Sequence, residues 1–161
     1  DPDAEQIAEA TLEASYRLKL FGIEPKVALL SHSNYGSHDN PSAAKMRKVW
    51  EILRARAPEL EMDGEMQADT AWDDLLRQRM FPHTTLSGRA NLFVMPNLDA
   101  ANIAYNMVRV MTEGVAIGPI LMGLDKSAHI LTPASSVRRV VNMTAVAAVD
   151  AQIRTANRRL G

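Results

Sequence analysis

The sequence contains no cysteine among its 161 residues. Disulfides, thiolate zinc sites and cysteine nucleophiles are therefore excluded, and the absence fits a reducing compartment, so we expect a cytoplasmic protein. The sequence also lacks an apolar run of about 18 residues, the length that a membrane-spanning helix needs. Its 18 basic and 19 acidic residues give a net charge of only -1. No overall positive field is available to attract nucleic acid or an anionic membrane, and we expect neither as a partner.

The chain has the size and composition of one globular domain. Hydrophobic residues make up 47% and charged residues 23% of it, which is ordinary for a protein with one buried core. We therefore expect a single domain over residues 1–161. The first residues, DPDAEQIAEA, are acidic and lack an initiator methionine, so we expect this domain to be a piece of a longer chain.

Short apolar runs alternate along the chain with segments of helical periodicity. The runs predict buried strands over 26–31, 60–67 and 91–96, the second with one wetter face, and an extended segment over 114–123. The periodic segments predict helices over 3–21, from Asn40 and Pro41 to Ala57, from Asp69 or Thr70 to about Arg79, from Asp99 to about Thr112, and from Ser135 or Ser136 to about Arg158.

Alternating strands and helices favour an α/β fold, with a largely parallel sheet covered by helices on both faces. We expect two of the helices to bury apolar side chains, namely Trp72, Leu75 and Leu76 in one and Ile103, Met107 and Met111 in the other. Sheets of this kind bind ligands beyond the carboxyl ends of their strands. The loops 31–40, 67–70 and 96–102 are therefore the candidate site.

The loop after the first strand, within VALLSHSNYGSHDNPSAAKM, is rich in hydroxyl and amide groups. Ser33, Asn34, Ser37 and the amides near Gly36 are suited to hydrogen-bonding a phosphate, and the following helix adds a favourable partial charge at its amino end. A simple strand-to-helix connection explains the same residues. The loop matches no nucleotide-binding fingerprint, and its own residues leave both interpretations open.

Three carboxylates and four histidines are candidates for catalysis or metal binding. Asp63, Glu65 and Asp69 suit acid–base catalysis or magnesium binding, but a solvated strand face followed by a helix cap is the simpler interpretation. The histidines show no spacing typical of metal ligands, and we expect no metal site.

Four collinear stretches resemble the phosphate acetyltransferase and butyryltransferase family. They are GIEPKVALLSHSNYGS (22–37), DGEMQADTA (63–71), GRANLFVMPNLDAANIAYNMV (88–108) and GPILMGLDKSAHILTPASSVRRVVNMTAVAAVDAQ (118–152). The resemblance implies a three-layer α/β/α fold, similar to isocitrate dehydrogenase and phosphate acetyltransferase, of which this chain is the carboxyl-terminal half. It also implies transfer of an acetyl group between coenzyme A and phosphate as the family's reaction.

One stretch departs from the family pattern. Family acetyltransferases carry Leu-Ser-Arg-Gly before the last helix and an acidic residue seven positions after that serine. The present sequence has Leu131, Thr132, Pro133 and Ala134, and Arg139 at the acidic position. Proline cannot replace a guanidinium, and arginine cannot accept a proton as a carboxylate does. Loss of a general base alone lowers rates by about a hundred- to ten-thousandfold, so we expect no catalytic residue in this chain.

The same departures resemble the acetyltransferase-like carboxyl-terminal portion of large bacterial NADP-dependent malic enzymes. That resemblance implies a regulatory domain that senses acetyl-CoA, while malate is oxidatively decarboxylated to pyruvate in another domain of the parent, which would hold the NADP and a divalent metal. The resemblance to the acyltransferases implies a homodimer, formed with the help of the apolar faces of the helices at 99–112 and 136–153, within a higher oligomer of the parent. Burial of those faces in the monomer's own core is the simpler interpretation of the pattern alone. An active phosphate acetyl- or butyryltransferase and a structural dimerisation module are the alternatives.

Motif positions and strand ends together give the ligand site that this resemblance implies. The expected contacts with acetyl-CoA, a related acyl-CoA or phosphate are Ser33, Asn34, Gly36, Ser37, Asn97, Asp99, Asn102, Gly118, Pro119, Met122, Gly123 and Thr132.

Overall fold

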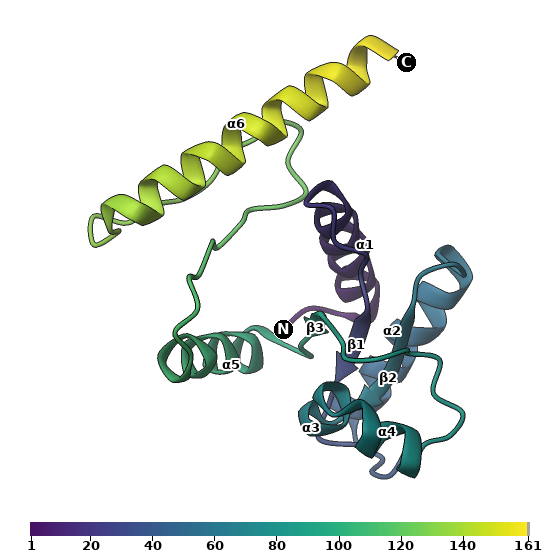
Figure 1. Cartoon of the computed structure of the whole chain (residues 1–161). Helices are drawn as coiled ribbons and strands as arrows, with labels where there is room; N and C mark the ends of the chain where they lie inside the picture. Colours follow the sequence, from purple (N-terminus) through teal and green to yellow (C-terminus); the bar gives the residue numbers. More distant parts are fainter. Residues whose placement is uncertain (161) are drawn as a thin grey trace. The chain divides into compact units, whose positions relative to one another are not determined.

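The computed structural model describes the backbone of residues 1–160 and the side chains of residues 1–156 (Figure 1). The chain divides into two compact units, residues 1–107 and the residues from Val108 onward. The predicted single domain over 1–161 stays a prediction.

The first unit is built around a small parallel sheet, as the alternating pattern predicted. Three strands lie in the order β2-β1-β3, and β1 pairs in parallel with both neighbours. The elements of this unit are α1 (Ala4–Leu20), β1 (Val27–Leu30), α2 (Pro41–Arg56), β2 (Met62–Met66), α3 (Ala68–Trp72), α4 (Asp74–Met80), β3 (Leu92–Val94) and α5 (Leu98–Met111), of which α5 continues past residue 107. The predicted α/β class is confirmed.

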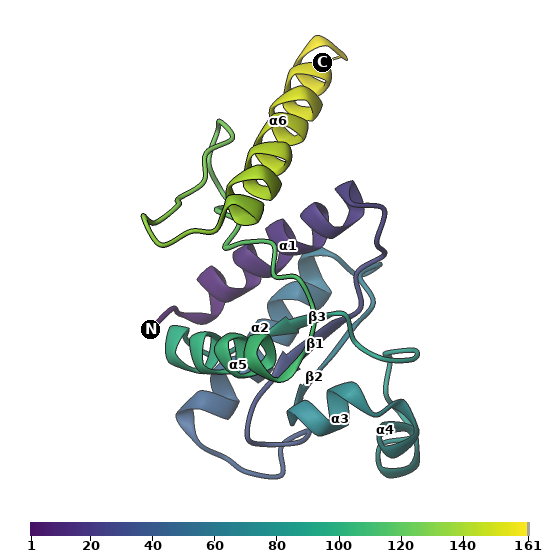
Figure 2. The ribbon, with the colours of Figure 1, turned by 60° about the vertical axis from the view of Figure 1, so that its left-hand side comes forward.

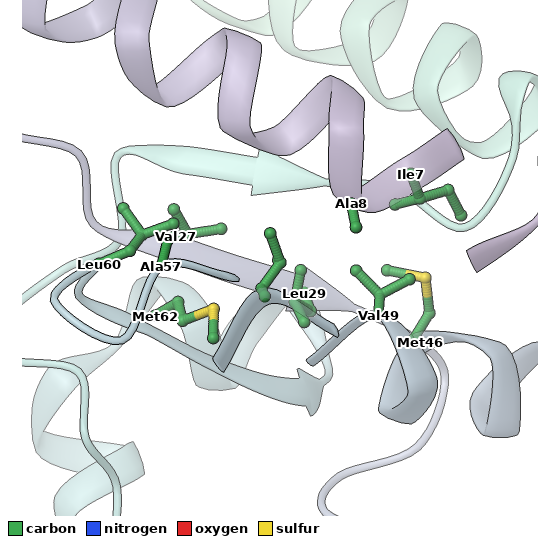
Figure 3. Packing of buried hydrophobic residues seen from close by; sticks show 10 residues of the cluster. Ile7, Ala8, Val27, Leu29, Met46, Val49, Ala57, Leu60 and Met62 are labelled. Carbon is green, nitrogen blue, oxygen red and sulfur yellow. The ribbon is translucent and has the colours of Figure 1, made fainter. Parts of the chain in front are cut away.

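Helices α1 and α2 cover one face of the sheet, where the larger apolar cluster lies (Figures 2 and 3). Val27 and Leu29 of β1 point into this cluster, together with Met46, Val49 and Leu53 of α2 and other side chains that are almost inaccessible to solvent. The alternate residues of β1 enter a second cluster on the opposite face, with Ala71 of α3 and the segment 86–90. Because both faces of β1 are covered, all four of its residues are buried, as expected for a central parallel strand.

Side-chain caps set the ends of the helices in this unit. The Asn40 side chain accepts from the amide of Ala43, and Pro41 is the first residue of α2, as predicted. The amino-terminal cap of α5 is Asn97, whose side chain accepts from the amide of Ala100, so the predicted cap at Asp99 is wrong. Asp99 lies instead in the first turn, where a carboxylate also stabilises the helix.

The helix predicted from Asp69 to Arg79 is two helices. Asp73 separates α3 from α4 because its backbone is extended and its side chain caps α4 by accepting from the amide of Leu76. The break changes which side chains face inward, and Trp72 and Leu75 are 57% and 79% exposed, against expectation. Arg77 is the buried residue of α4.

The predicted wetter face of the second strand is also wrong. Four of the five residues of β2 are buried, and Asp63 and Glu65 are only 5% and 1% exposed. Buried carboxylates need hydrogen-bond donors to offset the loss of solvation. Those donors come from the loop after β1, from α2 and from the segment after α4, as described below.

The helix α5 and its apolar side were predicted correctly, but the prediction that this side is buried is wrong. No residue of α5 is buried, and Ile103, Met107 and Met111 are 61%, 57% and 78% exposed. Helical periodicity identifies an apolar side of a helix but does not say whether another element covers it.

The second unit contains one long helix, α6 (Val137–Leu160), preceded by an irregular segment. Ser136 begins the helix, since its hydroxyl accepts from the amide of Arg139 and its carbonyl from that of Val140, as predicted. The expected extended segment 114–123 is irregular and forms no strand in the described part of the chain. No helix among the described residues has the length and apolar character needed to cross a membrane.

Candidate functional site

The loop after β1 closes around the carboxylate of Glu65, near the carboxyl end of β2. Glu65 Oε1 accepts from the Ser33 hydroxyl at 2.8 Å and from the Gly36 amide at 2.8 Å. It also accepts from Arg47 Nη1 of α2 at 3.1 Å. Three segments therefore meet at one oxygen atom, and bonds to a charged acceptor are stronger than bonds between neutral groups.

The amide groups of residues 33–38 are already engaged within the protein. Those of Ser33, Asn34 and His38 donate to serine hydroxyls of the loop, Tyr35 N donates to the Glu65 carbonyl at 2.7 Å, and Ser37 N donates to the Asn34 carbonyl at 2.9 Å. Tyr35 and Gly36 have positive φ angles of 48° and 83°, which turn two successive amides toward Glu65. Among the backbone amides and serine hydroxyls of this loop, only the Gly36 amide and the Ser33 hydroxyl bond to an anionic group, and that group is the protein's own Glu65 carboxylate.

A reciprocal pair of amide side chains fixes the same loop to the residue after β2. Asn34 Oδ1 accepts from the Gln67 amide at 2.7 Å, and Asn34 Nδ2 donates to Gln67 Oε1 at 3.2 Å. Gln67 Nε2 donates in turn to the His32 carbonyl at 2.7 Å. The ends of β1 and β2 are thereby held in one arrangement, with Gly36 and Ser37 exposed on the outside.

Arg47 bridges the buried carboxylate to the surface. Besides its bond to Glu65, it lies 2.5 Å from Asp39 Oδ1 through Nη2. The guanidinium is one-third exposed, whereas the Glu65 side chain is only 1% exposed. The Arg47 charge partly offsets the cost of burying the Glu65 carboxylate.

A second buried carboxylate, Asp63, organises the segment after α4. Asp63 Oδ2 accepts from the hydroxyls of Tyr35 and Thr84, at 3.0 Å and 2.6 Å, and from the amide of Thr85 at 2.9 Å. Burial raises the pKa of Tyr35 above its ordinary value, and the neighbouring negative charge of Asp63 acts in the same direction. The neutral phenol is therefore the favoured form in the folded protein.

Tyr35→Phe should make stability less sensitive to alkaline pH. Since the pKa of Tyr35 is raised on folding, its contribution is complete below the unfolded value of about 10 and is lost as the pH rises above it, by up to about 1.4 kcal/mol per pH unit. Urea unfolding between pH 9 and 11 measures this loss. The variant should lose less free energy of unfolding over that range than the parent chain, whereas Tyr16→Phe, at an exposed tyrosine, should match the parent. Equal losses in all three proteins would contradict the assignment.

The structure brings together the four predicted site residues of the first loop, namely Ser33, Asn34, Gly36 and Ser37. Ser33 is fully buried and shapes the loop from inside, while the other three are at least partly accessible. Three further predicted residues follow β3. Asn97 caps α5, Asp99 is exposed in its first turn, and the Asn102 side chain accepts from Asn106 Nδ2 at 2.7 Å. Their predicted contact with a ligand stays a prediction.

The remaining predicted residues belong to the second unit. Gly118 is buried, Met122 is half-buried, and Pro119, Gly123 and Thr132 are exposed. Thr132 lies in a turn, where its amide donates to the Ser135 hydroxyl at 3.1 Å, its own hydroxyl lies 3.4 Å from the same atom, and its carbonyl accepts from Ser135 N at 2.9 Å. Its ligand role also stays a prediction.

Sequence reasoning missed the organising roles of Glu65, Arg47 and Gln67. The sequence pattern predicts a solvated strand face for Glu65, with a catalytic or metal-binding carboxylate as the alternative, whereas the structure buries it. One feature of the sequence could have indicated the role of Glu65, namely an acidic residue next to a glycine in a short strand that follows a hydroxyl-rich loop. The described residues contain no group of three or more histidine, aspartate or glutamate side chains arranged to hold a metal ion.

A parallel sheet with polar loops at the carboxyl ends of its strands defines an α/β ligand-binding class of domain. Residues 1–148 match the family described as phosphate acetyl/butaryl transferase, and the chain belongs to this family. The phosphotransacetylase of Streptococcus pyogenes has the same fold, with a TM-score of 0.88 and 36% sequence identity over 94% of this chain and 46% of that one.

Both malic enzymes and phosphate acetyltransferases are similar to the chain. The NADP-dependent malic enzyme of Escherichia coli K12 is 56% identical over 153 residues, which cover 94% of this chain and 20% of the enzyme. The phosphate acetyltransferase of Paracoccus denitrificans is 44% identical over 150 residues, which cover 92% of this chain and 47% of that protein. The chain therefore spans about a fifth of the malic enzyme and about half of the acetyltransferase.

Proposed function

We propose that the chain is the acetyl-CoA-sensing regulatory domain of a cytoplasmic NADP-dependent malic enzyme and that it performs no acyl transfer itself. The observation that carries this proposal is the turn before α6. Its sequence departs from the acetyltransferase pattern, while the chain as a whole shares more identical residues with a malic enzyme than with an acetyltransferase. NADP and a divalent metal would be held by the parent's catalytic domain, outside this chain.

The chemistry of the turn supports the loss of catalysis. Pro133 provides no charged donor for a phosphate or an oxyanion, and the Thr132 hydroxyl lies 3.4 Å from the Ser135 hydroxyl, which is not a base at neutral pH. No aspartate or glutamate occurs between Asp125 and Asp150 in the sequence, so the neighbouring chain offers no carboxylate to accept a proton. These features favour binding without turnover over the alternative of an active phosphate acetyl- or butyryltransferase.

The loop after β1 supports a binding role. Asn34, Gly36 and Ser37 are at least partly exposed on a loop whose shape is fixed by Glu65 and Gln67, and a fixed loop loses little entropy when a ligand binds. In the proposal these residues contact acetyl-CoA or a related acyl-CoA, Ser33 positions them, and Asn97 contributes from the start of α5. The predicted contacts between Gly118 and Thr132 are included in the proposal because of their positions in the motifs that resemble the family.

Regulation requires that acetyl-CoA bind two states of the parent unequally. A coupling of about 1–3 kcal/mol, or about 5- to 150-fold in affinity, would give a useful response. We include a homodimer in the proposal, since symmetric assembly is the common way in which such states are coupled. A purely structural dimerisation module is the remaining alternative, and it predicts association without any effect of ligand.

Phosphate-dependent release of coenzyme A from acetyl-CoA by the complete parent protein tests the catalytic part of this proposal. We expect a rate at least about a hundredfold below that of a true acetyltransferase such as the Paracoccus relative, because base and guanidinium are both missing. The double variant Thr132→Ser and Pro133→Arg restores the serine and arginine of the family pattern and serves as the matched probe. An active transferase with an unusual centre would show robust release that the double variant hardly alters, and that result would overturn the proposal.

A further inference from the structure

The loop after β1 leaves no backbone amide of residues 33–38 free to bind an anion. Each of these amides donates to a group of the protein itself. A ligand phosphate at this loop therefore needs a donor from a neighbouring element. A guanidinium is well suited to that contact, because it is always charged and its N–H groups match the geometry of phosphate oxygens.

Arg47 of α2 lies beside the exposed part of this loop. Its Nη1 and the Gly36 amide donate to the same atom, Glu65 Oε1, at 3.1 Å and 2.8 Å. The two donors are therefore no more than two hydrogen-bond lengths apart. Gly36 is exposed and the Arg47 side chain is 33% exposed, so both are open to a ligand from solvent.

The other terminal nitrogen of this guanidinium is occupied by an exposed carboxylate. Arg47 Nη2 lies 2.5 Å from Asp39 Oδ1, and the Asp39 side chain is 87% exposed. An exposed ion pair of this kind contributes little to stability, and Asp39 has water to return to when it leaves. Glu65, at 1% exposed, has none. Glu51, one turn further along α2, lies 2.9 Å from Lys48 instead. Asp39 is therefore the partner that a ligand anion can replace.

We propose that Arg47 Nη2 binds a phosphate group of the acyl-CoA and that Asp39 competes with this phosphate for the same nitrogen. Asp39 holds the guanidinium in place while the site is empty and lowers the affinity for the ligand. The inference rests on the proposed function and adds to its site two residues that are not among the twelve predicted contacts. It also supplies the cationic contact that those twelve residues lack.

Equilibrium binding of acetyl-CoA to the complete parent protein, with and without Asp39→Asn, tests this inference. Asparagine keeps the shape of the side chain but removes its charge, so Arg47 is released for the ligand. We expect about two- to fivefold tighter binding, the range that an exposed ion pair allows, and a gain that shrinks as the salt concentration rises to about 1 M. Glu59→Gln is the matched control and should leave the affinity unchanged. It also removes one exposed negative charge, but Glu59 follows the end of α2 that is remote from the loop.

The Arg47→Met background shows whether Asp39 acts through the guanidinium. Arg47→Met should weaken acetyl-CoA binding about tenfold, and Asp39→Asn should give no gain there, because no guanidinium remains to be released. Ser33 and Gly36 still donate to Glu65 in this background. Any disturbance of the loop by Arg47→Met is common to the two proteins compared and cancels. An equal gain in both backgrounds would show that Asp39 acts by its charge alone and would overturn the proposed contact.

The remaining outcomes separate this inference from the proposed function. Equal acetyl-CoA affinities of the parent and of folded Asp39→Asn would overturn the inference alone. Absence of acetyl-CoA binding by both proteins would overturn the proposed function and the inference with it. Acetyl-dephospho-CoA, which lacks the 3′-phosphate, identifies the group that is bound. Loss of the gain with this ligand assigns the 3′-phosphate to Arg47, and an undiminished gain assigns the pyrophosphate.

Discussion

Arg77→Met is expected to lower the free energy of unfolding by about 3–5 kcal/mol, the usual cost of removing one partner from a buried charged network. The Arg77 side chain is fully buried in α4. Its guanidinium donates to the carbonyls of Thr70 and Ala71, at 3.1 Å and 3.3 Å, and to Asp74 Oδ1 at 2.8 Å. It also donates to the carbonyls of Leu86 and Gly88.

These bonds connect the end of the short helix α3 to the segment that leads into β3. Methionine has a similar length but no donor, so four backbone carbonyls and Asp74 would each lose a bond, and buried carbonyls left without a donor are costly. Chemical denaturation of the parent chain and the variant measures the loss. Arg79→Met, two residues later on an exposed position of the same helix, is the control and should cost less than about 0.5 kcal/mol. Similar losses in the two variants would show that the network around Arg77 contributes little.

Gly64→Ala is expected to be the second strongly destabilising change. Gly64 has a φ angle of +140°, and a Cβ atom added there would lie 2.7 Å from the carbonyl oxygen and 2.8 Å from the Cβ of Leu29. The strained backbone and the overlap with β1 each cost about 1–3 kcal/mol. Because Gly64 lies between Asp63 and Glu65, a shift of β2 should also disturb both buried carboxylates.

Gly22→Ala separates these two contributions. Gly22 follows α1 with a φ angle of +73°, but no atom lies within 4 Å of an added Cβ. It should therefore cost only the backbone term, about 1–2 kcal/mol. If Gly64→Ala proved no more destabilising than Gly22→Ala in the same urea titration, β2 would be free to move away from Leu29, and the close packing described here would be wrong.

Much of the first unit could be predicted from local sequence patterns. Short apolar runs located all three strands, and Asn40 with Pro41 located the start of α2, because these signals act within a few residues. The division between α3 and α4 was missed, since Asp73 resembles any other polar residue on a helix until its side chain is seen to cap the next helix. The cap of α5 was misplaced by two residues for the same reason.

The candidate site was less predictable because its contacts join distant segments. The loop at Ser33 and Gly36 was identified as polar and rich in hydroxyl groups, but its partner Glu65 is about thirty residues further along the chain, at separations of 32 and 29. A charged residue in an alternating strand is usually solvated, and only the donors from the loop and from Arg47 make its burial possible. The exposure of α5 could not be predicted either, since a hydrophobic pattern carries no information about what covers it.

Malate-dependent NADP reduction by the complete parent protein, measured over a range of acetyl-CoA concentrations, tests the central claim most directly. The account predicts a saturable fall in the rate of malate oxidation, with no phosphate-dependent acetyl transfer by the same preparation. Malate oxidation that does not respond to acetyl-CoA would contradict the sensing role. Absence of malate oxidation together with robust acetyl transfer would contradict the whole account and establish an acyltransferase instead.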